Sequence, residues 1–287
     1  MTSQRSFKKE KGILYLVPTP IGNLEDMTFR AVNILQSVDL IASEDTRNTQ
    51  KLLNHFEINV PQKSLHEHNY KERVPQLLEF LKQEKNIAQV SDAGMPSISD
   101  PGHELVLACL AENIPVVSLP GPTAGLTALI ASGLKPQPNY FYGFLPRKKK
   151  EQLSELEKLS NQEATMIFYE SPYRVASTLE NMRKIFGEKR KVVICRELTK
   201  IHEEYIRGTI QEVLDYIKEN ALKGECSLLV AGNPEPIVEK IVSKGTLQEQ
   251  VEDLINQGLK PNEAIKQVAK DNDLKRQEVY NEFHNIG

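Results

Sequence analysis

Residues 89–102 read QVSDAGMPSISDPG, a loop of small, hydroxyl-bearing and acidic residues that follows a short apolar run. The run at 87–91 predicts a buried strand, and Asp100-Pro101 predicts the start of a helix, with Asp100 as its N-cap. In open α/β sheets, ligands bind outside the carboxyl ends of the strands. We therefore expect Asp92, at the strand exit, to lie beside a ligand. The alternative is that the acidic residues, glycines and prolines of the loop only shape turns.

Outward from this loop, short apolar runs alternate with helical patterns. Such alternation favours a mainly parallel sheet with right-handed crossovers. The first half of the chain has predicted strands at 13–17, 40–43, 87–91 and 115–119, and predicted helices at 28–38, 46–56, 69–85 and 101–112.

The pattern begins anew after Gly133 and changes again after Asn233. The second half has predicted strands at 140–145, 165–169, 191–198, 204–208 and 227–231, with Ser171-Pro172 as a predicted helix start. Pro234 and Pro236 predict a linker, and three short helices follow at 247–256, 261–270 and 275–284. The chain is therefore an α/β protein with three predicted domains, at 12–121, 122–235 and 236–287.

Composition excludes several classes of protein. The 287 residues are 39% hydrophobic and 26% charged, with a formal net charge of -3, as in an ordinary folded protein. No run approaches the roughly 18 apolar residues of a membrane span. Because the amino terminus is polar and basic, without an apolar signal region, we expect a cytoplasmic protein with no membrane partner.

Cysteines and histidines are too scattered to predict a metal centre. Cys109, Cys195 and Cys226 form no CxxC pair, which argues against a disulfide framework and a zinc site. His66 and His68 lack a third ligand at a convincing spacing. We expect no protein-held metal, although magnesium bound to RNA stays compatible with the sequence.

Five motifs, taken together and in order, resemble one known family. They are VPTPIGNL at 17–24, SEDTRNT at 43–49, SDAGMPSISDPG at 91–102, LPGPTAGLTAL at 119–129 and FYESPYR at 168–174. The combination is similar to the ribosomal RNA small-subunit methyltransferase I family, cytidine-2′-O-methyltransferases of the tetrapyrrole methylase superfamily. The resemblance covers residues 12–232, so the last predicted domain lies outside it.

This resemblance implies two αβα domains, the first with a mainly parallel sheet and the second with a mixed sheet. The small helical domain that follows them is predicted from the sequence pattern alone. It further implies S-adenosylmethionine as the cofactor, bound in the cleft between the two domains, usually in a homodimer. The implied reaction is methylation of a cytidine ribose 2′-oxygen in the decoding region. The implied substrate is small-subunit ribosomal RNA or the 30S particle, which the sequence does not distinguish.

The resemblance also assigns cofactor positions, motif by motif. Two departures from the superfamily favour its RNA-modifying branch: Ala93 replaces the proline of the Gly-Asp-Pro loop, and VPTPIGN replaces the glycine-rich first turn of the tetrapyrrole enzymes. The positions carried over as cofactor-binding are Pro20, Asp92, Met95, Thr123, Ala124, Tyr169 and Gly208.

Methyl transfer to a ribose hydroxyl calls for alignment and for removal of the hydroxyl proton. Acidic residues can accept the proton, and arginines can stabilise the developing alkoxide or hold the adjacent phosphate. The candidates are Glu44, Asp45 and Arg47 after one strand and Glu170 and Arg174 after another. As an alternative, Glu44 and Asp45 only cap the next helix, and Glu170 only pairs with Arg174.

A basic turn is the candidate contact to RNA phosphates. Arg147, Lys148, Lys149 and Lys150 follow a predicted strand, although a charge run is often only a solvated face. The predicted domain at 236–287 is a second possible RNA contact. Two other functions stay open: methylation of a tetrapyrrole precursor, and a non-enzymic RNA-binding role in ribosome assembly.

Overall fold

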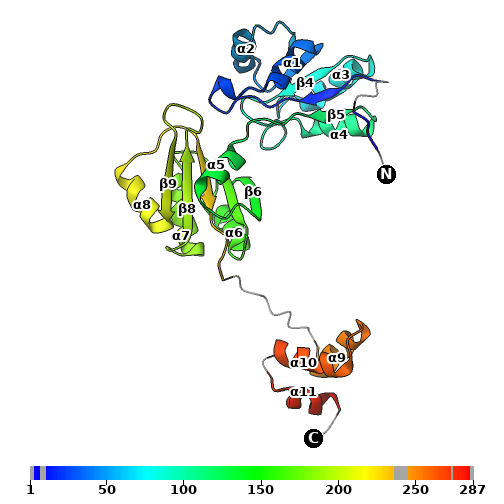
Figure 1. The fold of residues 1–287 in the computed structure, drawn as a ribbon, viewed down its shortest axis with the longest axis vertical. Helices are drawn as coiled ribbons and strands as arrows, with labels where there is room; N and C mark the ends of the chain where they lie inside the picture. Colours follow the sequence, from blue (N-terminus) through cyan, green and yellow to red (C-terminus); the bar gives the residue numbers. More distant parts are fainter. Residues whose placement is uncertain (1–2, 7–10, 236–244, 273, 285–287) are drawn as a thin grey trace. The chain divides into compact units, whose positions relative to one another are not determined.

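The computed structural model describes residues 3–6, 11–235, 245–272 and 274–284. The chain divides into two compact units, Met1–Pro234 and Glu235–Gly287 (Figure 1). Residues 236–244, with which the predicted helical domain begins, lie outside the described residues. In the part of the chain described, no helix has both the length and the apolar character needed to cross a bilayer.

The first sheet of the larger unit is entirely parallel, with strand order β3-β2-β4-β1-β5. Four of its strands confirm the apolar runs seen in the sequence. The fifth, β3, was not predicted, because its residues Gln-Lys-Ser are polar and it lies at the sheet edge. The strands are β1 (Leu14–Leu16), β2 (Leu40–Ser43), β3 (Gln62–Ser64), β4 (Ile87–Val90) and β5 (Val116–Ser118).

Helices cover both faces of this sheet, as a buried parallel sheet requires. Ile13 and Tyr15 pack with α1 and α2 in one core, whereas Leu14 packs with α3 and α4 in another. Figure 1 shows α1 and α2 on one side of the sheet and α4 on the other. The helices are η1 (Leu24–Asp26), α1 (Phe29–Ser37), α2 (Thr46–His55), α3 (Tyr70–Lys82) and α4 (His103–Ala111).

The second sheet is mixed, with strand order β6-β7-β10-β8-β9. β6 and β7 pair in parallel, and the three remaining pairs are antiparallel. The predicted sequence of a parallel sheet followed by a mixed one is thereby confirmed. The strands are β6 (Asn139–Phe144), β7 (Thr165–Glu170), β8 (Lys191–Arg196), β9 (Glu204–Thr209) and β10 (Cys226–Val230).

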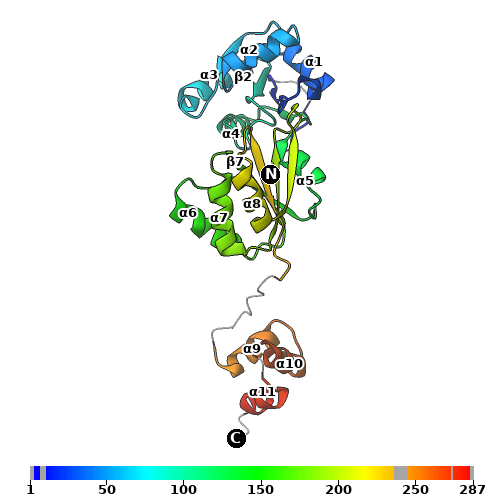
Figure 2. The same ribbon diagram turned by 90° about the vertical axis from the view of Figure 1, so that its left-hand side faces the viewer.

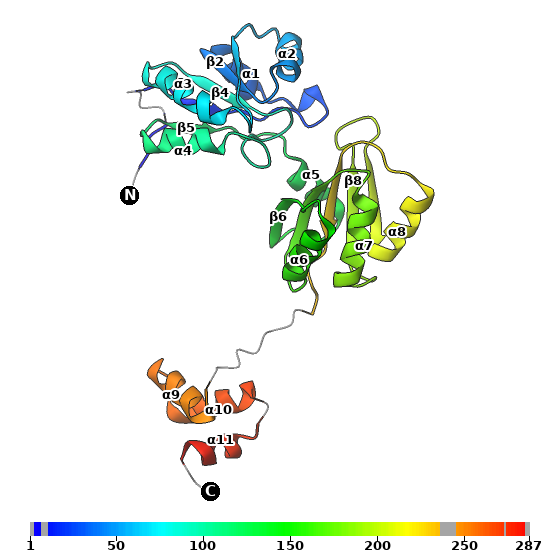
Figure 3. The ribbon, with the colours of Figure 1, turned by 180° about the vertical axis from the view of Figure 1, so that it is seen from behind.

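Successive residues of the second sheet face different helices. Met166 and Phe168 pack against α6, α7 and α8, whereas Ile167 packs against α5. Figures 2 and 3 show α7 on one side of the strands and α5 on the other. The helices are α5 (Ala124–Ser132), α6 (Lys149–Leu159), α7 (Val175–Phe186) and α8 (Ile210–Glu219).

The smaller unit has three short helices around its own core. Val251, Ile265 and Val279, one from each helix, are buried together. Thr246 caps the first helix through a reciprocal capping box with Glu249. The helices are α9 (Leu247–Asn256), α10 (Pro261–Asp271) and α11 (Arg276–Phe283), which confirms the three helical segments predicted there.

Two predicted helix starts are wrong, and both had been read from a Ser/Asp-Pro pair. α4 begins at His103 with Gly102 at its N-cap, so Asp100 does not cap it. α7 begins at Val175, because the residues after Ser171 first form a turn in which the Arg174 N–H donates to the Ser171 carbonyl (2.9 Å). In both cases the proline belongs to a loop that leads into the helix.

Candidate cofactor and substrate site

Two loops that follow neighbouring strands are hydrogen-bonded to each other. The N–H of Thr19 donates to the Gly94 carbonyl and the N–H of Gly94 to the Thr19 carbonyl, both at 3.0 Å. The Thr19 hydroxyl also donates to the Ser91 carbonyl at 3.0 Å. Gly94 has a φ of +77°, which favours glycine at this point. The turn after β1 and the loop after β4 therefore form one wall.

This wall faces a pocket of about 450 Å³. Ala93, Met95 and Asp100 line it from the β4 loop, and Ile21 lines it from the turn after β1, next to Pro20. The opposite side comes from the start of α5 and the ends of β7, β8 and β10. Of the predicted site residues, five line the pocket: Met95, Thr123, Ala124, Tyr169 and Glu170.

Tyr169 connects the second sheet to the start of α5. Its hydroxyl oxygen accepts from the Gly125 N–H at 3.2 Å, and the rings of Phe141 and Phe144 lie 5.2 and 5.6 Å from its ring. Burial raises the pKa of Tyr169. The phenol is thus a neutral acceptor that fixes the helix start at the pocket.

Asp92 points away from the pocket, toward the turn after β2. It is exposed, and its carboxylate accepts from the Asp45 N–H (3.3 Å) and from the Asn48 side-chain amide (2.9 Å). Glu44 in turn accepts from the Asp92 N–H at 3.2 Å. The Glu44 pKa is raised, first by burial and then by the charges of Asp100, Asp92 and Asp45. These contacts hold the β4 loop against the turn after β2 and the start of α2.

Asp45, which is half-buried, forms an ion pair with the exposed Arg47. Asp45 is the N-cap of α2, where its carboxylate accepts from the Arg47 N–H at 2.8 Å. The Arg47 guanidinium lies 2.7 Å from the same carboxylate, and its hydrogen bonds hold the Asp45 pKa at about 2. Neither side chain lines the pocket. Their geometry matches the capping alternative that the sequence had left open.

Gly208 lies on β9, away from the pocket wall. It is paired with Val192, three positions along the β8 ladder from Cys195, which does line the pocket. A Cβ at Gly208 would lie 3.2 Å from the Glu212 carboxylate of the α8 capping box. Of the predicted cofactor-binding residues, Pro20, Asp92 and Gly208 are therefore outside the pocket lining.

Asp100 is a pocket residue that sequence reasoning missed, because the Asp-Pro pair resembles a helix cap. It is half-buried in the wall of the pocket. Burial raises its pKa, a hydrogen bond with Ser91 opposes this shift, and the Asp92 charge adds to it. A carboxyl group with a raised pKa, in contact with the pocket, is suited to accept a proton there.

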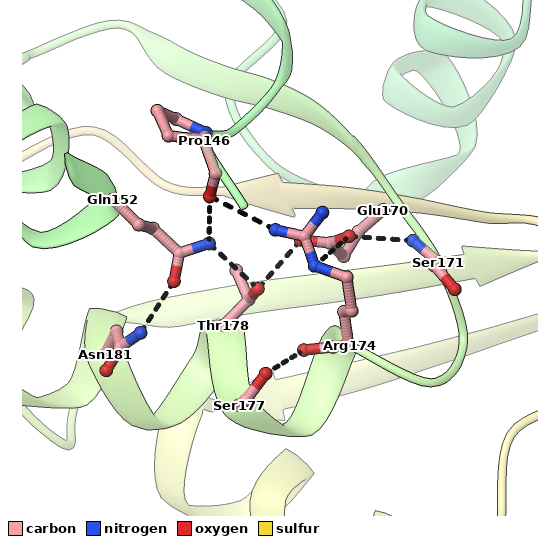
Figure 4. Close-up of polar contacts among 8 residues, drawn as sticks. All are labelled: Pro146, Gln152, Glu170, Ser171, Arg174, Ser177, Thr178 and Asn181. Carbon is pink, nitrogen blue, oxygen red and sulfur yellow. Dashed lines mark hydrogen bonds and ion pairs between the residues drawn. The ribbon is translucent and has the colours of Figure 1, made fainter. Parts of the chain in front are cut away.

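Glu170 lines the pocket and is the buried centre of a polar network that extends to α7. Figure 4 shows the residues of this network. Only 2% of its side chain is exposed. One carboxylate oxygen accepts from the Ser171 N–H at 2.9 Å and lies 3.6 Å from Arg174 Nε. The other accepts from the Thr178 hydroxyl at 2.8 Å. With both oxygens engaged, Glu170 is placed to hold these groups.

Glu170→Ala should therefore destabilise the fold. The Ser171 N–H and the buried Thr178 hydroxyl would lose their acceptor, and leaving such groups unsatisfied costs about 1–3 kcal/mol each. We expect the free energy of unfolding of the larger unit to fall by about 2–4 kcal/mol, measured by urea denaturation. Glu188→Ala, at an exposed carboxylate beyond α7, is the control and should change stability by less than about 0.5 kcal/mol. Equal effects of the two substitutions would contradict the network.

All four basic residues of the turn at 147–150 are exposed, and two of them also line a cavity. Lys148 precedes α6 and pairs with Glu151 at 3.0 Å, and Lys150 is exposed. Arg147 and Lys149 line a second cavity, of about 340 Å³, together with residues of α7. Lys148 and Lys150 are not part of the lining of this cavity.

Within the described residues, no group of three or more histidine, cysteine, aspartate or glutamate side chains is arranged to hold a metal ion. The three cysteines are buried and free. Burial raises the pKa of Cys195 to about 12. Although Cys195 lines the pocket, it is therefore a neutral thiol and contributes apolar surface.

Comparison with known proteins fixes the family. Residues 13–214 match the family model of the Tetrapyrrole (Corrin/Porphyrin) Methylases. The chain is 54% identical over 288 residues to the ribosomal RNA small subunit methyltransferase I of Streptococcus pyogenes serotype M3, with 100% of both chains covered. The chain belongs to the ribosomal RNA small subunit methyltransferase I family.

Other relatives bearing the methyltransferase I name are nearly as similar. The Bacillus subtilis protein is 52% identical over 286 residues, with 98% of both chains covered. The Synechocystis protein is 48% identical over 269 residues, covering 94% of this chain and 96% of the relative. The resemblance seen in the sequence motifs is thereby confirmed.

Solved structures of tetrapyrrole methylases share the fold of this methyltransferase I family member. A cobalt precorrin-4 methyltransferase superposes with a TM-score of 0.58 at 18% identity, covering 76% of this chain and 94% of the other. A Thermus thermophilus uroporphyrin-III C-methyltransferase, complexed with S-adenosylhomocysteine, gives a TM-score of 0.56 at 16% identity, with 77% and 97% covered. The predicted tetrapyrrole methylase architecture is confirmed.

Proposed function

We propose that this protein transfers a methyl group from S-adenosylmethionine to the 2′-oxygen of a cytidine ribose in the decoding region of small-subunit ribosomal RNA. The observation that carries the proposal is the pocket between the β4 loop and the start of α5. It lies in a chain similar, over its full length, to proteins named for action on small-subunit ribosomal RNA.

The pocket suits S-adenosylmethionine in size and chemistry. Its volume of about 450 Å³ lies within the roughly 300–1,000 Å³ typical of small-molecule sites. Ile21, Met95 and Leu198 supply apolar walls for an adenosine moiety, and the Thr123 side chain adds a polar group. The acidic side chain of Asp100 is complementary to a cationic cofactor. When bound, this cofactor supplies an electrophilic methyl group.

The chain's own residues have to orient the ribose and remove the hydroxyl proton. We assign the proton to the Asp100 carboxylate, because Asp100 faces the pocket while Asp45 and Asp92 do not. Glu44 holds the β4 loop through the Asp92 N–H. Glu170 has both oxygens engaged and positions Arg174. Arg174 lines a separate cavity and is left to hold the negative charge of an adjacent phosphate.

Labelled methyl transfer tests the proposed function. The purified protein would be incubated with methyl-labelled S-adenosylmethionine and small subunits that lack the modification, naked small-subunit RNA or a tetrapyrrole precursor. We expect label in RNA, with the better RNA acceptor identifying the form of the substrate. Label in the tetrapyrrole alone, or in none of the three, would contradict the proposal.

We also propose that the protein acts as a homodimer and that its smaller helical unit contacts RNA. Lys270, Lys275 and Arg276 at the α10–α11 connection supply positive charge in that unit. Sedimentation with and without RNA, on the full chain and on a chain ending at residue 234, measures both properties.

A further inference from the structure

We propose that the cavity between the basic turn and α7 binds a backbone phosphate of the RNA substrate. Arg147 and Lys149 line it from the start of α6, and Arg174 and Lys184 line it from α7 and the turn before it. This inference rests on the proposed function, which it extends by naming the group of the substrate that is held and the residues that hold it.

In the part of the chain that the structure describes, Arg174 is the one cation of the cavity lining that is paired with a carboxylate, that of Glu170. Among the described residues, no carboxylate lies within 4 Å of the charged groups of Arg147, Lys149 or Lys184. The acidic residue in the lining, Glu180, is 2.8 Å from Arg183 and is therefore already paired. In a chain with a formal net charge of -3, such a concave group of cations is a local attraction for an anion.

The floor of the cavity is fixed before any ligand arrives. Gln152 and Asn181 line it with only 3% and 6% exposure. The Asn181 amide donates to the Gln152 side-chain oxygen at 2.6 Å, and the Gln152 amide donates to the Thr178 hydroxyl at 3.3 Å and the Pro146 carbonyl at 3.4 Å (Figure 4). Because Pro146 precedes Arg147, these bonds set the position of the basic turn.

An ion pair links this cavity to the candidate cofactor pocket. The Arg174 guanidinium donates to the Pro146 carbonyl at 3.2 Å, and its Nε lies 3.6 Å from Glu170. Glu170 lines the first pocket and Arg174 lines the second cavity. In RNA, a phosphate and the reacting 2′-hydroxyl belong to the same short stretch of backbone. A phosphate held here is therefore placed to orient the ribose next to it.

The division of the basic turn provides a matched pair of variants. Lys149→Gln with Lys184→Gln removes two cations from the cavity, whereas Lys148→Gln with Lys150→Gln removes two from the outside. The probe is a labelled single-stranded fragment of small-subunit RNA, titrated with the full-length protein over a range of salt concentrations. We expect the cavity variant to bind at least about tenfold more weakly. Its log–log salt slope should fall by about 0.7, the value for one lost phosphate contact on single-stranded RNA. The outer variant should stay within about threefold of wild type.

Two further arms identify the source of the anion. Methylphosphonate replacement of single phosphates in the fragment should weaken wild-type binding at one position and have no added effect in the cavity variant. Calorimetric titration with inorganic pyrophosphate measures the binding of an anion in the cavity, whether or not the protein methylates RNA. Equal losses of RNA affinity in both variants would overturn the inference. A cavity variant that loses pyrophosphate binding but keeps its RNA affinity would also overturn it. The proposed function is tested independently of either result, by labelled methyl transfer with the wild-type protein.

Discussion

Asp100→Asn is expected to slow methyl transfer by about 100-fold, the lower end of the range for loss of a general base. The substitution keeps the shape of the side chain in the pocket wall and removes its ability to take a proton at neutral pH. Single-turnover rates with saturating S-adenosylmethionine and RNA measure the effect. Glu104→Gln, which removes an exposed carboxylate in the first turn of α4, is the control and should retain full activity. Full activity of Asp100→Asn would refute the assigned role.

The pH dependence of stability shows whether the Asp100→Asn protein is correctly folded. Burial raises the Asp100 pKa above its ordinary value of 3.8, so the folded state binds this proton more readily than the unfolded state. Ionisation therefore costs stability as the pH rises through the raised pKa, and asparagine removes that cost. We expect the variant to be more stable than wild type at pH 7, with the gain vanishing below about pH 3.8. If the Asp100→Asn protein is more stable than wild type but inactive, the loss of activity comes from the missing proton acceptor and not from misfolding.

Ala93→Trp should weaken S-adenosylmethionine binding by about 100-fold, or about 2.7 kcal/mol. Ala93 is exposed on the β4 loop and lines the pocket. An indole ring at this position fits without a clash in the core, and it fills part of the pocket that the ligand would occupy. Calorimetric titration of the purified protein with the cofactor measures the loss. The core is untouched, and we expect the unfolding midpoint to change little.

Ala221→Trp is the matched control for this experiment. Ala221 is also exposed and also borders a hollow, formed with Tyr173 and Ile217, whose lining contains no residue of the β4 loop. Its replacement should leave cofactor affinity within about twofold of wild type. Comparable losses in both variants would place the cofactor elsewhere.

The architecture of the larger unit follows from local patterns in the sequence. Strands such as Ile87–Val90 are fully buried on both faces, and burial demands the continuous apolar runs by which they were predicted. β3 lacks such a run, because it lies at the sheet edge and is held by backbone bonds to β2. β3 forms because it pairs with β2, and a pattern in the residues of β3 alone does not show that pairing.

The sequence predicted which loops form the site, but it did not predict which side chains of those loops face the pocket. The motifs at 91–102 and 119–129 do meet at one pocket, and Met95, Thr123 and Ala124 line it. Asp92 and Asp100 belong to the same loop and were assigned opposite roles. The fold turns Asp92 toward Asn48 and Asp100 toward the pocket. Lys184 joins the second cavity only because α7 packs beside α6, so no motif indicated it.

The position of the transferred methyl group shows whether the protein is a ribose 2′-O-methyltransferase. Small-subunit RNA methylated by the purified protein would be digested to nucleosides and analysed by mass spectrometry, with the modified nucleotide mapped on the intact RNA. We expect 2′-O-methylcytidine at a single decoding-region position, absent with the Asp100→Asn protein. A methyl group on a base, on another nucleoside or at many positions would contradict it.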